Sequence, residues 1–550
     1  MKQSIIEKYR KEFPVSEIPS LYPYQERAIT NLLIGKNSLT IVPTGGGKSI
    51  VYQLAGLEME GTVLVISPLK ALMQEQVNEL NSKSIKAIAL TSDIGFQEQR
   101  SVLRKLGKLN FKFIYVSPER LQNYFFRAAL IHSSNKISMV VIDEAHCISQ
   151  WGFDFRPEYA MIKGFLNFVN GNGHSPIVLA LSATLSVKAI DDIRQEFSIV
   201  EKTIFDHKSL IRSELKLNFI KTTDKKSAPE KWSHLLDFLK SRKSKKAIIY
   251  FYSKLKCEEL AKKFNVENAI EGLVADYFHS GIGESEKQNK YDAFKKGEIN
   301  ILFATTAFGM GMNIPDIDTI IQYHLPKSIE EYYQQIGRGA RNKNLCKECN
   351  CLLFWSEKNF KSNIQEIENE RCTDEKIKKA IEYLSLSGKA NKVSSINYSE
   401  LQNAKINLPK FLFYFEKLGV IERVGEVNGG PNSIRFKKST PMWLEVQNAA
   451  IGNSFIIASI RLKKSIQELI NYVFDQDLLE NVEFLPAMDK KLFIKELTDG
   501  LKPEQFEYIK NDISEKVNYQ LNRFDALQGL CRSYSPEKYL EKVFNNLLDV

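Results

Sequence analysis

The sequence predicts an α/β protein in which two tandem domains, each built on a doubly wound parallel sheet, precede a winged-helix domain and a helical C-terminal region. Short apolar runs alternate with helix-length segments, which is typical of parallel strands covered by helices on both faces. The alternation ends near residue 207 and starts again at once. We therefore expect domains at residues 1–207 and 208–365, a winged helix at 366–440, and a helical region of unknown role at 441–550.

Length and composition agree with several globular domains. The chain has 550 residues and a hydrophobic content of 43%, enough for more than one core. Its net charge of +10 favours polyanionic partners, although the excess of 76 basic over 66 acidic residues is mild. Seven cysteines fit a reducing compartment. The N-terminus lacks an apolar signal core and no stretch is apolar enough to span a membrane, so we expect a cytoplasmic protein without a membrane partner.

The expected strands are short and rich in β-branched residues. In the first domain they are Ser38–Val42, Thr62–Ser67, Lys112–Ser117, Ile137–Ile142 and Ile177–Leu181. In the second they are Ala247–Phe251, Leu273–Tyr277, Ile299–Ala304, Thr319–Tyr323 and Cys351–Phe354. Two such domains in tandem leave a cleft in which a nucleotide could draw them together.

A glycine-rich turn connects the first strand to a helical segment. It contains Thr44, Gly45, Gly46, Gly47, Lys48 and Ser49. A strand, such a turn and a helix together form a phosphate cradle, because the glycines let several backbone N–H groups converge on phosphate oxygens. Lys48 would reach the outer phosphates of ATP, and Ser49 would bind Mg²⁺. The alternative is a turn with a solvated lysine.

Two carboxylates, Asp143 and Glu144, follow the apolar run Ile137–Ile142. At the carboxyl end of a parallel strand they would face a ligand crevice. Asp143 is suited to hold Mg²⁺ through water, and Glu144 to polarise an attacking water. The alternative is that the pair only caps a following helix.

An aromatic segment lies a few residues downstream of these carboxylates. It contains Trp151, Phe153, Phe155 and Arg156. Flat rings beside a cation suit stacking on unpaired bases, although rings in loops are more often buried. We interpret residues 142–159 as the segment that couples ATP hydrolysis to the binding of single-stranded nucleic acid.

The second domain carries two arginines, Arg338 and Arg341, spaced three residues apart. On a helix this spacing would put both guanidinium groups on one face. Directed across a cleft, they could neutralise charge on the transferring phosphoryl group. The alternative is a solvated pair.

Residues 15–355 resemble superfamily 2 helicases, and within them the RecQ family. The resemblance lies in the ordered motifs Leu21–Gln25, Pro43–Ser49, Ser67–Val77, Tyr115–Leu121, Asp143–His146 (a DEAH box), Ser149–Pro157, Ser182–Thr184, Ala304–Asn313 and Tyr332–Arg338. It implies two RecA-like domains, ATP and Mg²⁺ as cofactors, and 3′-to-5′ translocation with unwinding of duplex DNA.

The resemblance also assigns roles to single residues. Gln25 would read adenine, and Arg341 would be the arginine finger with Arg338 beside it. His146 and Gln334 would link hydrolysis to the bound strand, and Ser182 and Thr184 match a motif implicated in coupling.

The chain departs from the family in several places. Tyr22 replaces an arginine, Phe153 replaces a histidine, and the usual G-R-A-G-R-D is Gly337–Asn342 with its two small residues exchanged. The four-cysteine zinc site common after the second domain is not evident. Cys346, Cys349, Cys351 and Cys372 supply four thiols, but their spacing and placement do not match, so free thiols are the favoured interpretation.

The winged helix is expected from helices near 374–386, 398–401 and 409–418, followed by a hairpin of Val420–Val424 and Ser433–Lys437. Its wing carries Arg435, Lys437 and Lys438, which favours DNA over a protein partner. Residues 441–550 show helical apolar spacing that suits a core or a docked protein.

We conclude from the sequence that the chain is an ATP-dependent DNA helicase acting on single strands and duplex junctions, in DNA repair, recombination or genome defence. One alternative is an RNA-directed helicase. The other is an ATP-gated DNA-binding subunit of a larger assembly that does not separate strands.

Overall fold

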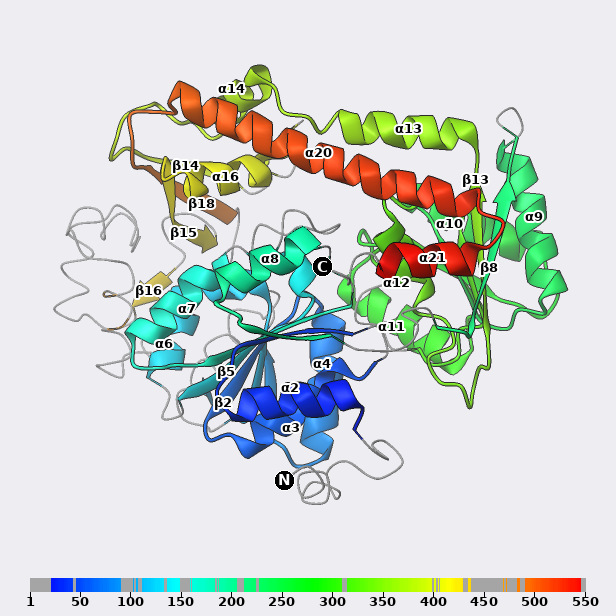
Figure 1. The fold of residues 1–550 in the computed structure, drawn as a ribbon, viewed down its shortest axis with the longest axis horizontal. Coiled ribbons are helices and arrows are strands. Elements are labelled where there is room, and N and C mark those ends of the chain that lie inside the picture. Colours follow the sequence, from blue (N-terminus) through cyan, green and yellow to red (C-terminus); the bar gives the residue numbers. More distant parts are fainter. Residues whose placement is uncertain are drawn as a thin grey trace.

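The computed structural model describes residues 21–42, 46–90, 102, 105–106, 111–132, 136–148, 159, 161–183, 185, 187–204, 212–223, 227–308, 314–397, 400–401, 404, 406–428, 434–436, 468, 471, 482–484 and 490–545. These residues form two parallel sheets with covering helices, a smaller antiparallel sheet, and two helices near the C-terminus (Figure 1). No helix in these ranges is long and apolar enough to cross a membrane.

The first lobe is a seven-stranded parallel sheet in the order β3-β4-β2-β5-β6-β1-β7. Its strands are β1 (Ser38–Ile41), β2 (Thr62–Ile66), β3 (Ala87–Leu90), β4 (Phe113–Val116), β5 (Ile137–Ile142), β6 (Ile177–Ser182) and β7 (Glu201–Ile204). The central strands are buried on both faces, which explains their unbroken apolar runs. The five strands expected in this lobe are confirmed, and β3 and β7 are additional.

Each face of the first sheet has its own core. Helices α2 (Pro23–Leu33), α3 (Lys48–Glu58) and α4 (Lys70–Ser82) cover one face. Helices α6 (Tyr124–Ile131), α7 (Ile162–Gly171) and α8 (Val187–Glu196) cover the other. This layering places the carboxyl ends of β1 and β5 at the same edge of the sheet.

The second lobe is a six-stranded parallel sheet in the order β10-β11-β9-β12-β13-β8. Its strands are β8 (Leu215–Lys221), β9 (Ala247–Tyr250), β10 (Ala275–Phe278), β11 (Ile301–Ala304), β12 (Thr319–Gln322) and β13 (Cys349–Trp355). Its helices are α9 (Ser227–Ser241), α10 (Lys254–Val266), α11 (Glu284–Lys296), α12 (Ile329–Ile336) and α13 (Glu357–Glu368). The tandem α/β architecture is therefore confirmed, with β8 as an unexpected edge strand.

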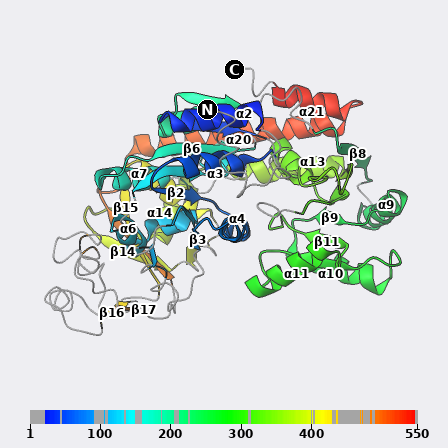
Figure 2. The ribbon, with the colours of Figure 1, turned by 90° about the horizontal axis from the view of Figure 1, so that it is seen from below.

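The lobes face each other through α4 and α11, as Figure 2 shows from below. Lys295 of α11 lies 4.0 Å from the Glu75 carboxylate of α4. Both side chains are partly exposed, so this contact contributes little to stability and is compatible with movement between the lobes.

A three-stranded antiparallel sheet in the order β14-β18-β15 follows the second lobe. It combines β14 (Val393–Asn397), β15 (Ile421–Asn428) and β18 (Lys490–Glu496), with α14 (Asp374–Tyr383) and α16 (Leu408–Lys417) packed beside it. We call α14, β14, α16, β15 and β18 the C-terminal module. Gly419, with φ of +64°, lies just past the end of α16, where a left-handed glycine is favoured.

The expected hairpin of Val420–Val424 with Ser433–Lys437 is wrong. β15 pairs with β18, and β16 (Ile434–Phe436) pairs with β17 (Val482–Phe484). The central strand of the module therefore comes from within the region expected to be helical. The expectation failed because it paired strands that are adjacent in sequence, whereas β15 and β18 are separated by a long segment.

Two helices complete the described chain and confirm a helical C-terminal region. The first, α20 (Pro503–Cys531), has 29 residues and so extends for about 43 Å. It runs from the C-terminal module to the second lobe, where α21 (Pro536–Asn545) packs against it (Figure 1).

Candidate active site

The glycine-rich turn leads directly into α3, whose first two residues are Lys48 and Ser49. Gly47 caps this helix in the left-handed conformation, with φ of +77° and without a capping side chain. A Cβ atom there would lie 2.8 Å from Gln25 Nε2, so a glycine is required. The helix N-terminus thus offers backbone donors and a positive dipole end to an anion. Thr44 and Gly45 lie outside the described residues.

Helix α2 is fastened to this turn. The Gln25 amide nitrogen donates to the carbonyl of Gly47 over 3.1 Å, and its oxygen accepts from the backbone N–H of Tyr22 over 2.9 Å. The Tyr24 hydroxyl donates to the carbonyl of Gly46. Gln25, which the resemblance assigns to adenine, is thus engaged with the phosphate-loop backbone. Tyr22 stacks on Tyr24 and keeps 53% of its surface exposed.

Lys48 contacts one of the two carboxylates at the end of β5, and the other lies beside it. Lys48 Nζ lies 3.5 Å from Glu144 Oε1. Asp143 accepts from the Ser67 hydroxyl at 3.2 Å and from the backbone N–H of Glu144 at 3.0 Å. The structure therefore brings together the lysine and the carboxylates that the sequence predicts for one site.

Glu144 has a left-handed backbone, with φ of +50°. This conformation costs a residue with a side chain about 1 kcal/mol, and such strain collects at functional sites. It follows β5 directly and turns the chain into the short 3₁₀ helix Ala145–Cys147. The sharp turn keeps both carboxylates at the strand end.

The two carboxylates have opposite protonation tendencies. Burial, together with the neighbouring Glu144 charge, raises the pKa of Asp143 to about 6. Burial alone would also raise the pKa of Glu144, but Lys48 and His146 outweigh it and hold that pKa well below its ordinary value. The site therefore keeps Glu144 ionised, and a cation bound at Asp143 would favour the ionised form of that carboxyl too.

His146 connects the carboxylates to β6. Its Nδ1 atom lies 3.2 Å from the Ser182 hydroxyl and 3.3 Å from Glu144 Oε2. His146 and Ser182 are almost completely buried. A side-chain path thus joins Glu144 to the strand end that carries the predicted coupling motif, although Thr184 lies outside the described residues.

The aromatic residues Trp151, Phe153 and Phe155, with Arg156, lie outside the described residues. Tyr159, which follows them, donates its hydroxyl hydrogen to the backbone carbonyl of Asp143 over 2.9 Å. Tyr159 is 1% exposed. Tyr159, to which the sequence alone assigned no role, is therefore bound to the end of β5.

The arginines of the second lobe do not lie on a helix, so that expectation is wrong. Helix α12 ends at Ile336, residues 337–340 form a turn, and Arg341 follows directly. We call residues 337–341 the arginine turn. Arg212 holds it by donating to the carbonyls of Gly337 at 3.1 Å and Gly339 at 2.9 Å. Arg212 lies outside every motif, so nothing in the sequence indicated it.

Positive charge is concentrated at the arginine turn. Burial, followed by the charges of Arg338 and Arg212, lowers the pKa of Arg341 to about 9. Burial also raises the pKa of Glu75 on α4, and Lys295 and then Arg341 oppose that rise. The field of Arg341 therefore reaches the first lobe. Gln334 lies half-buried on α12, one turn before these arginines.

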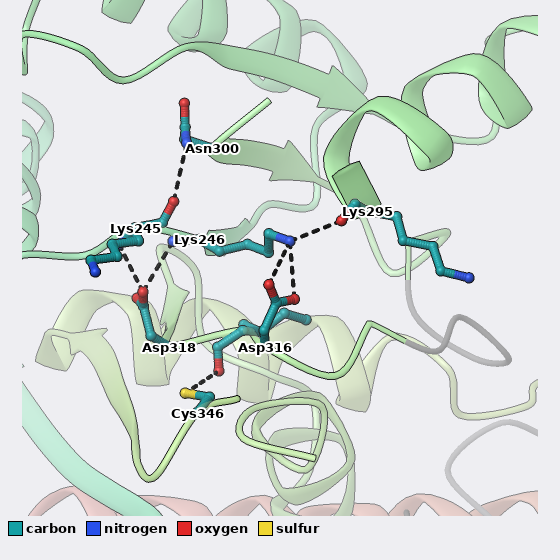
Figure 3. Close-up of polar contacts among 8 residues, drawn as sticks. Lys245, Lys246, Lys295, Asn300, Asp316, Asp318 and Cys346 are labelled. Carbon is teal, nitrogen blue, oxygen red and sulfur yellow. Dashed lines mark hydrogen bonds and ion pairs between the residues drawn. The ribbon is translucent and has the colours of Figure 1, made fainter. Parts of the chain in front are cut away.

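The four cysteines considered for zinc do not form a common site. Cys346 directs its thiol to the backbone carbonyl of Ile317, 3.6 Å away (Figure 3). Cys349 and Cys351 are buried in β13. Cys372 stands just before α14 and contacts the carbonyl of Thr373. Within the described ranges, no group of three or more histidine, cysteine or acidic side chains is placed to hold a metal ion.

The carboxylates near Cys346 are instead bound to the residues that precede β9. Asp316 binds Lys246 Nζ at 2.8 Å, and Asp318 accepts from the backbone N–H groups of Lys245 and Lys246 at 2.7 and 3.1 Å (Figure 3). These bonds tie the start of β9 to that of β12.

Comparisons with known proteins agree with this geometry. The DEAD/DEAH box helicase family matches residues 22–193, and the helicase conserved C-terminal domain matches residues 230–343. The ATP-dependent DNA helicase RecQ of Pasteurella multocida is 38% identical over 318 residues, which are 58% of this chain and 48% of that protein. The probable ATP-dependent DNA helicase RecS of Bacillus subtilis is 33% identical over 361 residues, which are 66% of this chain and 69% of that protein.

A solved structure supports the fold along most of the chain. The helicase Lhr of Mycobacterium smegmatis, bound to single-stranded DNA and AMP-PNP, superposes with a TM-score of 0.54 and 14% identity, covering 99% of this chain and 95% of that one. The present chain spans about half the length of the Pasteurella relative and about two thirds of the Bacillus relative. By its motifs, its two lobes and these relatives, the chain belongs to the RecQ family of superfamily 2 helicases.

Proposed function

We propose that this chain is an ATP-dependent DNA helicase that moves 3′ to 5′ along one strand. The observation that carries the proposal is the contact of Lys48 with Glu144, beside Asp143 and at the N-terminus of α3. A phosphate cradle, a base and a metal-binding carboxylate thus meet at one sheet edge. Both relatives described above are named as ATP-dependent DNA helicases.

The residues present fit a magnesium nucleotide. Ser49 and Asp143 would hold Mg²⁺, which would supply charge neutralisation at the phosphates. Lys48 exchanges its carboxylate partner for phosphate oxygens, which frees Glu144. Because Lys48 is among the groups that depress the Glu144 pKa, losing this contact makes Glu144 a stronger base for orienting water.

The two lobes act together in this proposal. The arginine turn approaches the phosphates when α11 and α4 close on each other, and Arg341 and Arg338 then stabilise charge that develops in the transition state. His146 transmits the state of Glu144 to β6 through Ser182. Tyr22, exposed beside the cradle, stacks on the base where relatives use arginine, while Gln25 contacts its edge.

The C-terminal module is the proposed winged helix, at residues 366–440 with β18 added. The strand order β14-β18-β15, with α14 and α16 packed beside the sheet, supports this proposal. It contacts duplex DNA ahead of the motor. The cellular role proposed here is DNA repair, recombination or genome defence, in the cytoplasm.

Lys48→Ala should abolish ATP turnover, because the outer phosphates lose their only lysine in the cradle. ATPase rates with single-stranded DNA and RNA of equal length, and displacement of a 3′-tailed against a 5′-tailed duplex, test the rest. Lys36→Ala, an exposed lysine in the same lobe, is the control and should behave as wild type. Hydrolysis without displacement, or stronger stimulation by RNA, would overturn the proposal.

Trp151→Ala should separate hydrolysis from DNA binding. Basal ATPase should persist because the cradle is untouched, while stimulation by single-stranded DNA should disappear since a stacking platform is lost. The comparison is the ratio of rates with and without DNA. Full stimulation of the variant would show that the aromatic segment does not sense the strand.

A further inference from the structure

Helix α20 joins the C-terminal module to the second lobe through one continuous core. Its first half buries Ile509, Ile513 and Val517, and its second half buries Phe524 and Leu527, all at 1% exposure or less. These side chains belong to a single hydrophobic cluster that also holds α16, β18 and α12. Figure 1 shows α20 crossing from one part to the other.

The first half of α20 is anchored to α16 by buried polar groups. Lys516 Nζ donates to the Tyr414 hydroxyl at 2.8 Å and pairs with Asp512. The Tyr414 hydroxyl donates to Asp512 at 2.5 Å. Lys516 is 5% exposed, so these groups have few alternative partners in water and fix the register of α20 on the module.

The second half of α20 and the following α21 hold α12. Arg523 of α20 forms an ion pair with Glu330, in which the side chains keep only 14% and 9% of their surface exposed. The Phe544 ring of α21 packs on the Tyr333 ring with centroids 4.9 Å apart. Glu330 and Tyr333 are three residues apart and therefore lie on one face of α12.

The position of α12 determines the position of the arginine turn, because the turn begins where that helix ends. Gly337 donates its N–H to the carbonyl of Tyr333 over 2.9 Å, and Arg338 follows immediately. A displacement of α12 would therefore carry Arg338 and Arg341 with it. Misplacing a catalytic group by about 1 Å can reduce a rate by about a hundredfold.

We infer that α20 and α21 form a positioning element for ATP hydrolysis, in which Arg523 and Phe544 set the place of the arginine turn through α12. The inference rests on the proposed ATPase function and deepens it. It assigns a role to residues 503–545, which lie beyond the regions matched by the two helicase families. Arg523 and Phe544 are positioning residues, because they contact α12 and not the nucleotide cradle.

The test compares two arginine variants of the full-length protein. Arg523→Ala removes the buried partner of Glu330. Arg532→Ala removes an exposed arginine at the end of the same helix, paired with Glu357 of α13 at 48% and 43% exposure. Steady-state ATPase gives kcat and KM, a fluorescent ATP analogue gives nucleotide affinity, and thermal unfolding shows that each variant is folded.

We expect Arg523→Ala to lower kcat by between about tenfold and about a hundredfold, since the transition-state contacts are displaced. KM and analogue affinity should stay near wild type, because Lys48 and α3 lie in the first lobe. Arg532→Ala should keep wild-type kcat. Arg523→Lys should recover part of the loss, since it restores the positive charge beside Glu330.

Equal kcat values for Arg523→Ala and Arg532→Ala would overturn the inference. If Arg523→Ala does not fold, Phe544→Leu and Arg523→Lys carry the test, and wild-type kcat in both would overturn it equally. The proposed function fails separately, because a wild-type protein without ATPase activity contradicts that function before any variant is compared.

Discussion

The arginine turn departs from the family pattern at two single residues, Gly339 and Ala340. Ala340 adopts a left-handed conformation, with φ of +44°, where the usual order places glycine. Gly339 lies against Cys349, whose sulfur would be 2.2 Å from a Cβ at that position. The exchange of small residues therefore accommodates a cysteine of β13 beneath the turn, at the cost of strain at Ala340.

Two substitutions in this turn should have opposite effects. Ala340→Gly should stabilise the protein by about 1 kcal/mol, because glycine adopts the left-handed conformation without strain. Gly339→Ala should destabilise it by about 1–3 kcal/mol, because the added methyl overlaps Cys349. Free energies of unfolding from denaturant titrations provide the comparison. Gly164→Ala on α7, where a Cβ meets nothing within 4 Å, is the control and should stabilise by up to about 1 kcal/mol.

His324, two residues after the end of β12, should make stability depend on pH. Burial, followed by the charge of Lys231, lowers its pKa from 6.5 to about 4. The unfolded chain therefore takes up the proton first as pH falls, so His324 destabilises the fold progressively between pH 6.5 and about 4 and has no such effect above that window. The loss approaches about 3 kcal/mol.

His324→Phe should flatten the plot of unfolding free energy against pH within this window, since a phenyl ring cannot take up a proton. Tyr323→Phe, which removes a neighbouring hydroxyl and keeps the imidazole, is the control and should retain the wild-type slope. Identical slopes for wild type and His324→Phe would show that the imidazole does not titrate in the folded state as described.

At the scale of elements, one carboxylate at the end of β18 binds the loop that follows α14. Glu496, at 2% exposure, accepts hydrogen bonds from the backbone N–H groups of Ser387, Gly388 and Lys389 and from the Ser387 hydroxyl, at 2.7–3.3 Å. The loop after α14 thereby closes on a strand that is more than a hundred residues away in the sequence.

Glu496→Gln should destabilise the protein by about 2–4 kcal/mol, because the amide keeps the shape but loses the charge and places donors against donors. The midpoint of denaturant unfolding measures the change. Glu504→Gln, an exposed residue in the first turn of α20, should leave the midpoint unchanged. A shift of the same size in both variants would contradict the role of Glu496.

Elements whose signals are local could be predicted from the sequence. The central strands of both lobes carry unbroken apolar runs, and the cradle residues Lys48 and Ser49 follow one of them after a glycine-rich turn. Asp143 and Glu144 were assigned to the same edge because parallel strands share a direction, and the structure places Lys48 and Glu144 in contact. Edge strands such as β8, whose side chains are mostly half-buried or exposed, gave a weaker signal and were missed.

Features that depend on distant pairing could not be predicted. The partner of β15 is β18, which no local pattern indicates. Arg212 holds the arginine turn from the segment that links the lobes, and Tyr159 holds the strand end from beyond the aromatic segment. The three-residue spacing of Arg338 and Arg341 suggested a helix, but the glycines and the left-handed Ala340 end α12 before them.

At the scale of the whole molecule, the hydrophobic cores divide the protein into unequal units. The first lobe has two cores, one on each face of its sheet, and both consist of its own residues. One core of the second lobe continues through α20 into the C-terminal module. The second lobe and the module are therefore joined by buried apolar surface, whereas the ion pair of Lys295 with Glu75 between the two lobes is partly exposed.

This division predicts two unfolding transitions. Along a denaturant series, pulse-labelling hydrogen exchange should show β1 and β5 losing protection together, and α12, α20 and β18 losing protection together in a separate step. The reason is that α12, α20 and β18 share one core while β1 and β5 do not contribute to it. Protection of α20 that is lost independently of α12 would contradict a common unit.

A non-hydrolysable ATP analogue should move only one of these transitions in the absence of DNA. The cradle of Gly47 and Lys48 belongs to the first lobe, so ligand at a hundred times its dissociation constant should stabilise β1 and β5 by about 2.7 kcal/mol. Lys48→Ala, the control, should show no shift because binding is weakened. Equal shifts of both transitions would mean that the two lobes are already closed around the nucleotide and unfold as one unit. We do not expect this result, because the contact of Lys295 with Glu75 between the lobes is partly exposed.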